Sequence, residues 1–274
     1  MKSKNCSPIG LFDSGVGGWS VLNAVHELMP HESLIYVADS AFAPYGDKSP
    51  KQIIERSFSI VDFLVGEGCK AIVVACNTAT AAAISHLRDH YQVPIIGVEP
   101  GIKPAVEQSL TGRVGVMATQ YTVESEKFQH LLSRFENKQI VIQPCPGLVE
   151  LIEAPETLDQ QLLEYLSSQL SSFRREGIDT LALGCTHYGF VLDQIKTVLG
   201  EAVRIIDTPS AVARELKRRL DSEDLVCDDS TSSVQLLTTS EDLVRAQNRV
   251  EKLLKRDWVV THQSIGDKDA KSVI

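Results

Sequence analysis

The sequence predicts an α/β protein with two similar lobes, each built on a mostly parallel sheet flanked by helices. Three observations support this fold class. Short apolar runs alternate with helix-length amphipathic segments, one stretch of the chain is repeated in its second half, and two apolar runs end on proline. At 274 residues the chain is long enough for two lobes with ordinary hydrophobic cores.

Eight apolar runs are the candidate strands, and each has the length of a buried strand in a parallel sheet. In chain order they are PIGLFDS (8–14), SLIYVAD (33–39), AIVVACN (71–77), PIIGVEP (94–100), RVGVMAT (113–119), QIVIQPC (139–145), TLALGCT (180–186) and VRIIDTP (203–209). Residues 52–67, 79–91, 123–135 and 158–176 lie between them and have the patterning of amphipathic helices. This alternation predicts βαβ units.

An internal repeat divides the chain into its lobes. EGCKAIVVACNT (67–78) aligns without gaps with EGIDTLALGCTH (176–187), and the same register sets Pro100 level with Pro209. A looser match sets Ser14 level with Thr119. Because a new helix begins at Pro209, we expect residues 208–260 to cross back and complete a first lobe of residues 1–100. Residues 101–207 then form the second lobe, and the unpatterned residues 261–274 form a flexible tail.

Composition and charge limit the partners and the compartment. The formal net charge is -9 and no basic run occurs, which argues against nucleic acid or an anionic membrane as the main partner. No apolar run approaches the length of a membrane span, and the N-terminal residues lack the apolar region of a secretory signal. We therefore expect a protein of the cytoplasm.

Six cysteines lie far apart in the sequence, at positions 6, 69, 76, 145, 185 and 227. A chain of this size does not need disulfide bonds for stability, and no CxxC pair occurs, so all six are expected as reduced thiols. Cys6, Cys69, Cys145 and Cys227 belong to no recognisable motif, and we interpret them as structural.

Cys76 and Cys185 occupy equivalent places in the repeat, where a strand ends and a helix begins. A single free cysteine is more often a small buried hydrophobe than a reactive group. Two in equivalent places, each followed by polar residues, favour a function. The N–H groups of a helix N-terminus, and His187 beside Cys185, are expected to lower the pKa of these thiols.

Two further motifs bear on the chemistry. DSGVGG (13–18) lacks the spacing of a dinucleotide site or a P-loop, so we do not expect a phosphate site. Asp13 is either a helix N-cap, or it lies at the same strand end as Cys76 and serves as a supporting base or as the partner of an ammonium group. His86 and His90 have the spacing of a metal pair on a helix but no third ligand, so no metal site is expected.

The motifs GLFDSGVGG, PYG, ACNTAT, GVEPGIKPAV and GCTHYGF occur in this order between residues 10 and 190. Together they resemble the cofactor-independent aspartate/glutamate racemase family. The resemblance implies an active site between the two lobes, no cofactor, and one acid/base thiol from each lobe. It assigns these thiols to Cys76 and Cys185. The assisting residues that it implies are Asp13, His187 and Glu153, and the choice between Glu150 and Glu153 stays open. The substrate-holding positions that it implies are Asp13, Ser14, Pro44, Tyr45, Gly46, Cys76, Asn77, Thr78, Thr119, Cys185, Thr186 and His187.

The resemblance also implies a function: interconversion of L- and D-glutamate, with D-glutamate supplied to peptidoglycan, by a homodimer that needs no partner except its small-molecule substrate. The residues agree with this chemistry, because racemisation removes the α-proton from one face and delivers a proton to the other, so two groups of matched acidity are needed. Two alternatives stay open. One is an aspartate racemase or another isomerase with a cysteine pair, and the other is a non-catalytic amino-acid-binding protein.

Overall fold

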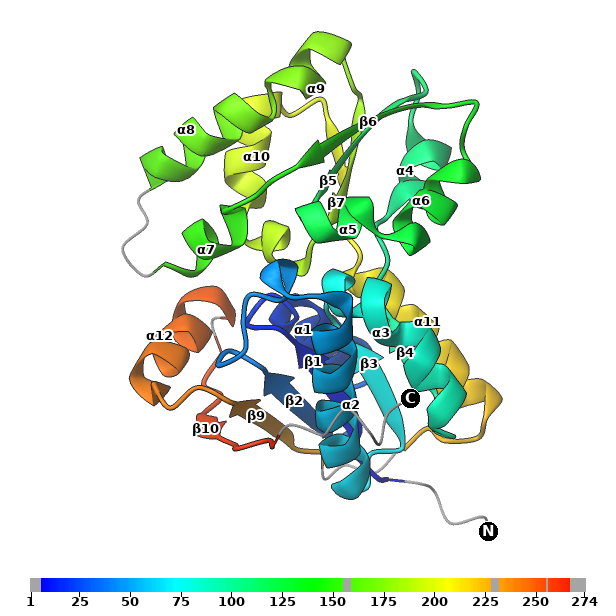
Figure 1. The fold of residues 1–274 in the computed structure, drawn as a ribbon, viewed down its shortest axis with the longest axis vertical. Coiled ribbons are helices and arrows are strands. Elements are labelled where there is room, and N and C mark those ends of the chain that lie inside the picture. The colour runs from blue at the N-terminus through cyan, green and yellow to red at the C-terminus, as the bar shows by residue number, and fades with distance from the viewer. Residues whose placement is uncertain (1–5, 155–158, 228–231, 255, 267–274) are drawn as a thin grey trace. The chain divides into compact units, whose positions relative to one another are not determined.

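The computed structural model describes residues 6–154, 159–227, 232–254 and 256–266. It divides the chain into two compact units: unit 1 comprises Met1–Val98 and Pro209–Ile274, and unit 2 comprises Glu99–Thr208. Each unit contains one parallel sheet flanked by helices (Figure 1). The predicted fold class, two mostly parallel sheets flanked by helices, is confirmed.

The sheet of unit 1 has the strand order β10-β9-β2-β1-β3-β4, and every pair of neighbours is parallel. Its strands are β1 (Ile9–Asp13), β2 (Leu34–Ala38), β3 (Ala71–Val74), β4 (Ile95–Gly97), β9 (Val234–Thr238) and β10 (Val260–His262). Every residue of β1, β2 and β3 is buried, as expected for central strands that are covered on both faces.

Two groups of helices pack in unit 1. Helix α2 (Pro50–Gly66) packs with α3 (Asn77–His90), whereas α1 (Trp19–Leu28) packs with α11 (Pro209–Ser222) and α12 (Leu243–Leu254). The two groups lie on opposite faces of the sheet (Figure 1), as expected from the right-handed crossovers usual between parallel strands. A short 3-10 helix, η1 (Tyr45–Asp47), lies between β2 and α2.

The sheet of unit 2 has the order β6-β5-β7-β8, also parallel throughout. Its strands are β5 (Arg113–Ala118), β6 (Gln139–Pro144), β7 (Thr180–Gly184) and β8 (Arg204–Ile206). Alternate residues of β7 serve different faces, because Leu181 and Leu183 pack in one hydrophobic cluster and Ala182 in another. The helical segments are α4 (Ile102–Gln108), α5 (Gln120–Glu124), α6 (Glu126–Ser133), α7 (Leu148–Glu153), α8 (Asp159–Gln169), α9 (Ser171–Glu176), η2 (Thr186–Val191) and α10 (Leu192–Leu199).

The two sheets share one topology. The order β2-β1-β3-β4 in unit 1 corresponds to β6-β5-β7-β8 in unit 2, strand for strand in chain order. All eight strands predicted from apolar runs are present, and the repeated stretches contain β3 and β7. Cys76 and Cys185 therefore follow corresponding strands. The sequence did not predict β9 and β10, which extend the first sheet beyond β2.

The segment predicted as a flexible tail begins with ordered residues. Thr261 and His262 belong to β10, where they pair with Leu237 and Thr238 of β9. Beyond them, the carbonyl of Ile265 accepts a hydrogen bond from Arg56 Nη1 at 2.8 Å. The sheet supplies hydrogen bonds that residue patterning does not reveal, so the predicted start at residue 261 is wrong. The rest of that prediction, residues 267–274, lies outside the described residues.

Cys6 and Cys227 form a disulfide bond with a Cα–Cα distance of 4.9 Å, which corrects the expectation of six reduced thiols. Cys69, Cys76, Cys145 and Cys185 are free and buried. Cys6 precedes β1, and Cys227 follows α11, the helix with which the chain returns to unit 1. This return brings together two residues that are 221 positions apart, a proximity that cysteine spacing does not show.

Reduction of this disulfide is expected to lower the free energy of unfolding by about 2–4 kcal/mol, because the bond restricts the unfolded chain across a long loop. Urea unfolding of the purified protein with and without dithiothreitol measures the change. The variant Cys6→Ser is the control, since its unfolding midpoint should equal that of the reduced protein and should not respond to the reductant. Identical midpoints for the oxidised and reduced wild type would show that the bond contributes nothing.

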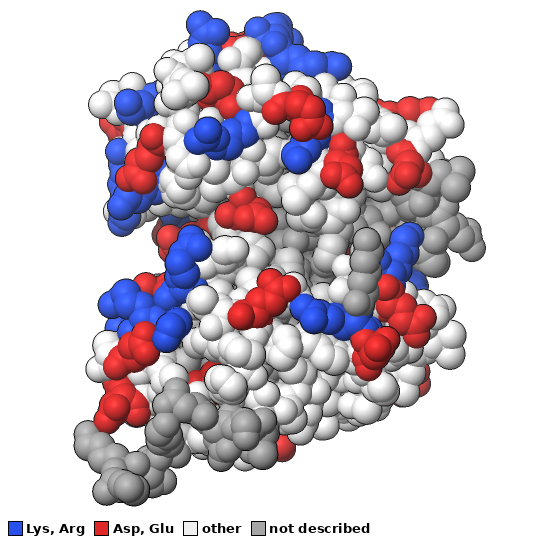
Figure 2. Space-filling model, turned by 180° about the vertical axis from the view of Figure 1, so that it is seen from behind, with Lys and Arg blue, Asp and Glu red and all other residues white. Residues whose placement is uncertain are grey.

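The surface mixes charges of both signs. On the face seen in Figure 2, lysines and arginines stand among aspartates and glutamates. In the parts of the chain that the structure describes, no helix has the length and apolar character needed to cross a membrane.

Candidate functional site

Asp13 is the last residue of β1, and its buried carboxylate organises the loop that follows. One oxygen accepts hydrogen bonds from the backbone N–H of Ser14 at 2.7 Å and from the Ser14 hydroxyl at 3.3 Å. The other accepts from the N–H of Gly18 at 2.5 Å. A Cβ at position 18 would lie 2.7 Å from the Tyr36 hydroxyl and 2.9 Å from the Asp13 Cβ, so this close approach requires glycine.

Cys76 follows β3 and is the N-cap residue of α3. Its sulfur accepts the N–H of Ala79 at 3.4 Å, and its thiol lies 3.8 Å from the Ser14 hydroxyl, to which it donates. The Ser14 hydroxyl in turn donates to Asp13. Cys76 is therefore linked through one hydroxyl to a buried carboxylate, at the edge of a parallel sheet where ligands usually bind.

The pKa of the Cys76 thiol lies well above its ordinary value, which corrects the expectation that the helix N-terminus lowers it. Burial is the main cause, and the negative charge of Asp13 adds to it. The hydrogen bond from the Ala79 N–H and the hydrogen bond between Cys76 and Ser14 lower the pKa but are outweighed. Without a bound cation beside Asp13, Cys76 is thus a neutral thiol at neutral pH.

Asn77 carries the clearest sign of a binding site in unit 1. Its side chain is 5% exposed, and neither the amide nitrogen nor the amide oxygen has a hydrogen-bond partner among the described residues. A buried amide without partners is costly, so such a group is usually completed by a ligand or water. The neighbouring Thr78 is also buried. Both residues begin α3 directly behind Cys76.

Tyr45 and Gly46 of the PYG motif belong to η1, and Pro44 is its N-cap residue. The three residues differ in burial. Tyr45 is 1% exposed, and its hydroxyl donates to Asp39 Oδ2 at 2.7 Å. Gly46 is exposed, and Pro44 is half-buried at the N-terminal end of η1. The side chain of Tyr45 therefore anchors this turn inside unit 1, whereas Gly46 next to it is exposed.

Cys185 follows β7 in unit 2, and its sulfur lies 3.8 Å from His187 Nδ1. The other ring nitrogen of His187 lies 2.8 Å from Glu153 Oε1, on α7. Glu150 is exposed on the same helix, so the structure brings Glu153, rather than Glu150, to the histidine. Cys185 is thus linked through one polar side chain to a carboxylate, as Cys76 is in unit 1.

The pKa of His187 lies well above its ordinary value. Burial alone would lower it, but the hydrogen bonds and negative charges of Cys185 and Glu153 outweigh burial and favour the imidazolium. A protonated imidazole between a sulfur and a carboxylate can donate a hydrogen bond or a proton to that sulfur.

Two threonines complete the predicted set. Thr119, the residue that the repeat sets level with Ser14, follows β5, and its hydroxyl accepts the N–H of Thr122 at 3.2 Å, so it caps α5. Thr186 is buried between Cys185 and His187. Both lie at the carboxyl edge of the second sheet. Unit 1 therefore holds Asp13, Ser14, Pro44, Tyr45, Gly46, Cys76, Asn77 and Thr78, and unit 2 holds Thr119, Glu153, Cys185, Thr186 and His187.

A buried group that the sequence did not indicate lies next to η1. Asp39 pairs with Arg56 at 2.6 Å, and Thr239 donates to the same carboxylate at 2.9 Å. The only signal in the sequence was that Asp39 ends a predicted strand, as Asp13 does. Across the described ranges, no group of three or more histidines, cysteines, aspartates or glutamates is placed to hold a metal ion.

A thiol linked to a carboxylate at the same place in two related α/β units can remove a proton from carbon and return one. Removing a proton from carbon and returning one is how an isomerase inverts a carbon centre. The comparisons with known proteins also identify the chain as an isomerase. The sequence model described as Asp/Glu/Hydantoin racemase matches residues 20–216, and the chain belongs to this family. It is an amino-acid racemase.

Relatives of known identity cover most of the chain. A glutamate racemase of Clostridium perfringens is 48% identical over 221 residues, which are 80% of this chain and 85% of that protein. The crystal structure of glutamate racemase isoform RacE1 from Bacillus anthracis has a TM-score of 0.88 and 31% identity, covering 96% of this chain and 99% of that chain. The Escherichia coli glutamate racemase, crystallised with L-glutamate and the activator UDP-MurNAc-ala, has a TM-score of 0.83 and 31% identity, covering 96% of this chain and 99% of that chain.

Proposed function

We propose that the protein interconverts L- and D-glutamate without a cofactor, with Cys76 and Cys185 as the two acid/base groups. The observation that carries the proposal is the equivalence of the two cysteines, each at the end of a corresponding strand and each linked to a carboxylate. Racemisation has the same symmetry, because one group must remove the α-proton and another must deliver a proton to the opposite face.

In each turnover one sulfur begins as a thiolate and the other as a thiol. The thiolate takes the α-proton and becomes a thiol, while the thiol on the other face gives its proton to the carbanion and becomes a thiolate. The reverse reaction exchanges the two roles. Hydrogen-bond donors around the substrate carboxylates stabilise the charge that develops at the α-carbon.

The residues next to each sulfur adjust its pKa or stabilise its negative charge, so that the sulfur can both take and give a proton. In unit 1, the charge of Asp13 raises the pKa of Cys76, and a substrate ammonium group beside Asp13 offsets that charge. Substrate binding thus brings the thiol closer to the acidity needed for catalysis. In unit 2, His187 and Glu153 stabilise negative charge on Cys185 through the imidazolium.

Asn77 supports a substrate that carries both carboxylate and ammonium groups. Its unpartnered amide offers N–H donors and an acceptor oxygen next to Cys76, which match the carboxylate and ammonium groups of an amino acid. Glutamate, rather than aspartate, is supported by the relatives at 48% and 31% identity, which are glutamate racemases.

The assay follows the optical activity of L-glutamate, D-glutamate and L-aspartate in separate incubations with the purified protein. We expect both glutamate enantiomers to approach the racemic mixture and aspartate to change far more slowly. Dialysis against a chelator, without added pyridoxal phosphate, should leave the rate unchanged. Faster turnover of aspartate would assign the other member of the family, and binding of glutamate without turnover would indicate an amino-acid-binding protein.

We also propose that the protein supplies D-glutamate for peptidoglycan, acting in the cytoplasm as a homodimer. Its glutamate racemase relatives support the first part, and an acidic chain without a basic run agrees with a small-molecule substrate. Expression of the chain should restore growth of a bacterium that requires added D-glutamate. Sedimentation of the purified protein should give twice the mass of the chain.

A further inference from the structure

Two buried ion pairs flank β2 in unit 1, one at each end of the strand. At the amino end, Glu32 pairs with Lys70 at 2.6 Å. At the carboxyl end, Asp39 pairs with Arg56. All four side chains are at most 6% exposed. Replacing a buried ion pair by apolar residues is often neutral for stability, so burial of an ion pair does not by itself show that its role is to stabilise the fold. Only the carboxyl end belongs to the edge that carries the candidate site.

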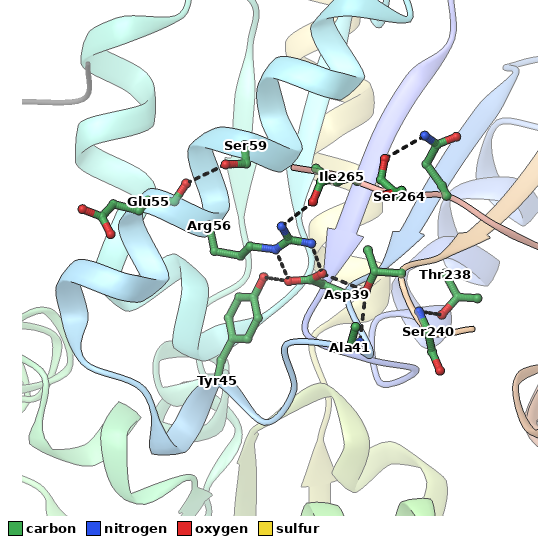
Figure 3. Close-up of polar contacts among 12 residues, drawn as sticks. Asp39, Ala41, Tyr45, Glu55, Arg56, Ser59, Thr238, Ser240, Ser264 and Ile265 are labelled. Atoms are coloured by element: carbon green, nitrogen blue, oxygen red, sulfur yellow. Dashed lines mark hydrogen bonds and ion pairs between the residues drawn. The ribbon is translucent and has the colours of Figure 1, made fainter. Parts of the chain in front are cut away.

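The Asp39 carboxylate is completely occupied (Figure 3). One oxygen accepts from Arg56 Nη2 at 2.6 Å and from the Thr239 hydroxyl at 2.9 Å. The other accepts from Arg56 Nε at 2.8 Å and from the Tyr45 hydroxyl at 2.7 Å. Such a fork between arginine and carboxylate fixes direction as well as distance. The carboxylate therefore holds the Tyr45 ring from one side while Arg56 holds the carboxylate from another.

The same group joins segments that are far apart in the chain. The backbone N–H of Asp39 donates to the carbonyl of Asp13 at 2.9 Å, at the end of β1. Arg56 Nη1 donates to the carbonyl of Ile265, in the segment after β10. The Thr239 hydroxyl also accepts the N–H of Ala41, in the turn between β2 and η1. These bonds connect the turn around Tyr45 to both the Asp13 loop and the C-terminal segment.

We propose that Asp39 and Arg56 are positioning residues for substrate binding, acting through the Tyr45 hydroxyl on the backbone of η1. Because the Tyr45 side chain points into the Asp39 pair, what η1 presents to a substrate is its backbone around Gly46. The place of that backbone depends on the hydroxyl bond. This inference rests on the proposed function, since it assumes that η1 contacts the substrate.

The test compares Asp39→Asn with Glu32→Gln. Each variant removes the charge of one buried carboxylate with little change in shape, and each leaves a buried cation without its ion partner. We expect Asp39→Asn to raise the KM for glutamate about tenfold or more with kcat changed by less than about threefold, because positioning contacts act on substrate and transition state alike. We expect Glu32→Gln to lower the urea unfolding midpoint and to leave KM within about twofold.

Two further variants keep the test decisive if Asp39→Asn fails to fold. Tyr45→Phe removes only the hydroxyl and should raise KM by about threefold or more, and Arg56→Lys, which keeps the charge but loses the fork, should lie between wild type and Arg56→Gln in KM. Unchanged KM in folded Tyr45→Phe, or equal KM changes in Asp39→Asn and Glu32→Gln, would overturn the inference. Absence of glutamate turnover in the wild type would instead refute the proposed function.

Discussion

Replacing Cys76 or Cys185 by alanine is expected to lower kcat by about 10²- to 10⁴-fold in both directions of the reaction, the usual contribution of a general acid/base group. In the proposed mechanism each thiol serves one face of the α-carbon, so loss of either would block L-to-D and D-to-L conversion alike. Both variants remove only one small side chain and should stay folded, which circular dichroism in the far ultraviolet checks. Initial rates with each enantiomer measure the effect.

Cys69 provides the matched control. It is a buried free cysteine that precedes β3, whereas Cys76 follows the same strand. Cys69→Ala removes the same atoms from the other edge of the sheet and should keep kcat within about threefold of wild type, whatever it costs in stability. A Cys76→Ala or Cys185→Ala variant that retains more than about a hundredth of the wild-type rate contradicts the assignment of that thiol.

Glu153→Gln is expected to lower kcat about ten- to hundredfold, less than loss of a thiol because Glu153 acts on Cys185 through His187. Removal of the carboxylate also removes one of the two groups that raise the pKa of His187. Burial then weighs more heavily, so the pKa of His187 falls. The limb of the pH profile of kcat/KM that reports His187 should move to lower pH in this variant.

Glu150→Gln is the control for this prediction. Glu150 lies on the same helix and carries the same charge, but it is exposed. Its variant should keep both the rate and the pH profile of the wild type. Equal losses in the two variants would show that the net charge of α7, and not the bond to His187, is responsible.

Most of the fold could be predicted from the sequence, because buried parallel strands appear in it as short apolar runs. The sequence did not reveal β9 and β10, because neither strand forms a long run of buried apolar residues. Val234 and Gln235 of β9 are not fully buried, and β10 is three residues long with two exposed positions. The disulfide between Cys6 and Cys227 was missed for a related reason. The disulfide and the two additional strands all depend on the position to which the chain returns after α11, and the sequence does not show that position.

For the candidate site, the sequence located residues but not their contacts. The repeat pointed to Cys76 and Cys185, and the structure places both at corresponding strand ends. The sequence did not show the environment of Cys76, where burial and the charge of Asp13 raise the pKa that we expected to be lowered. It left Glu150 and Glu153 open, because only the packing of α7 decides which carboxylate reaches His187. Asp39 and Arg56 were missed, since their meeting requires the sheet and α2 to be placed together.

The central claim, that two different groups serve the two faces of the α-carbon, is tested most directly by racemisation of L-glutamate in deuterium oxide. In the two-thiol mechanism the proton delivered comes from a sulfur that has exchanged with solvent, so the first D-glutamate formed should carry deuterium at the α-carbon, as read by mass spectrometry, while unreacted L-glutamate still carries protium. If the early D-glutamate retains the protium of the substrate, a single group transfers the proton between the faces, and the assignment of separate roles to Cys76 and Cys185 is wrong.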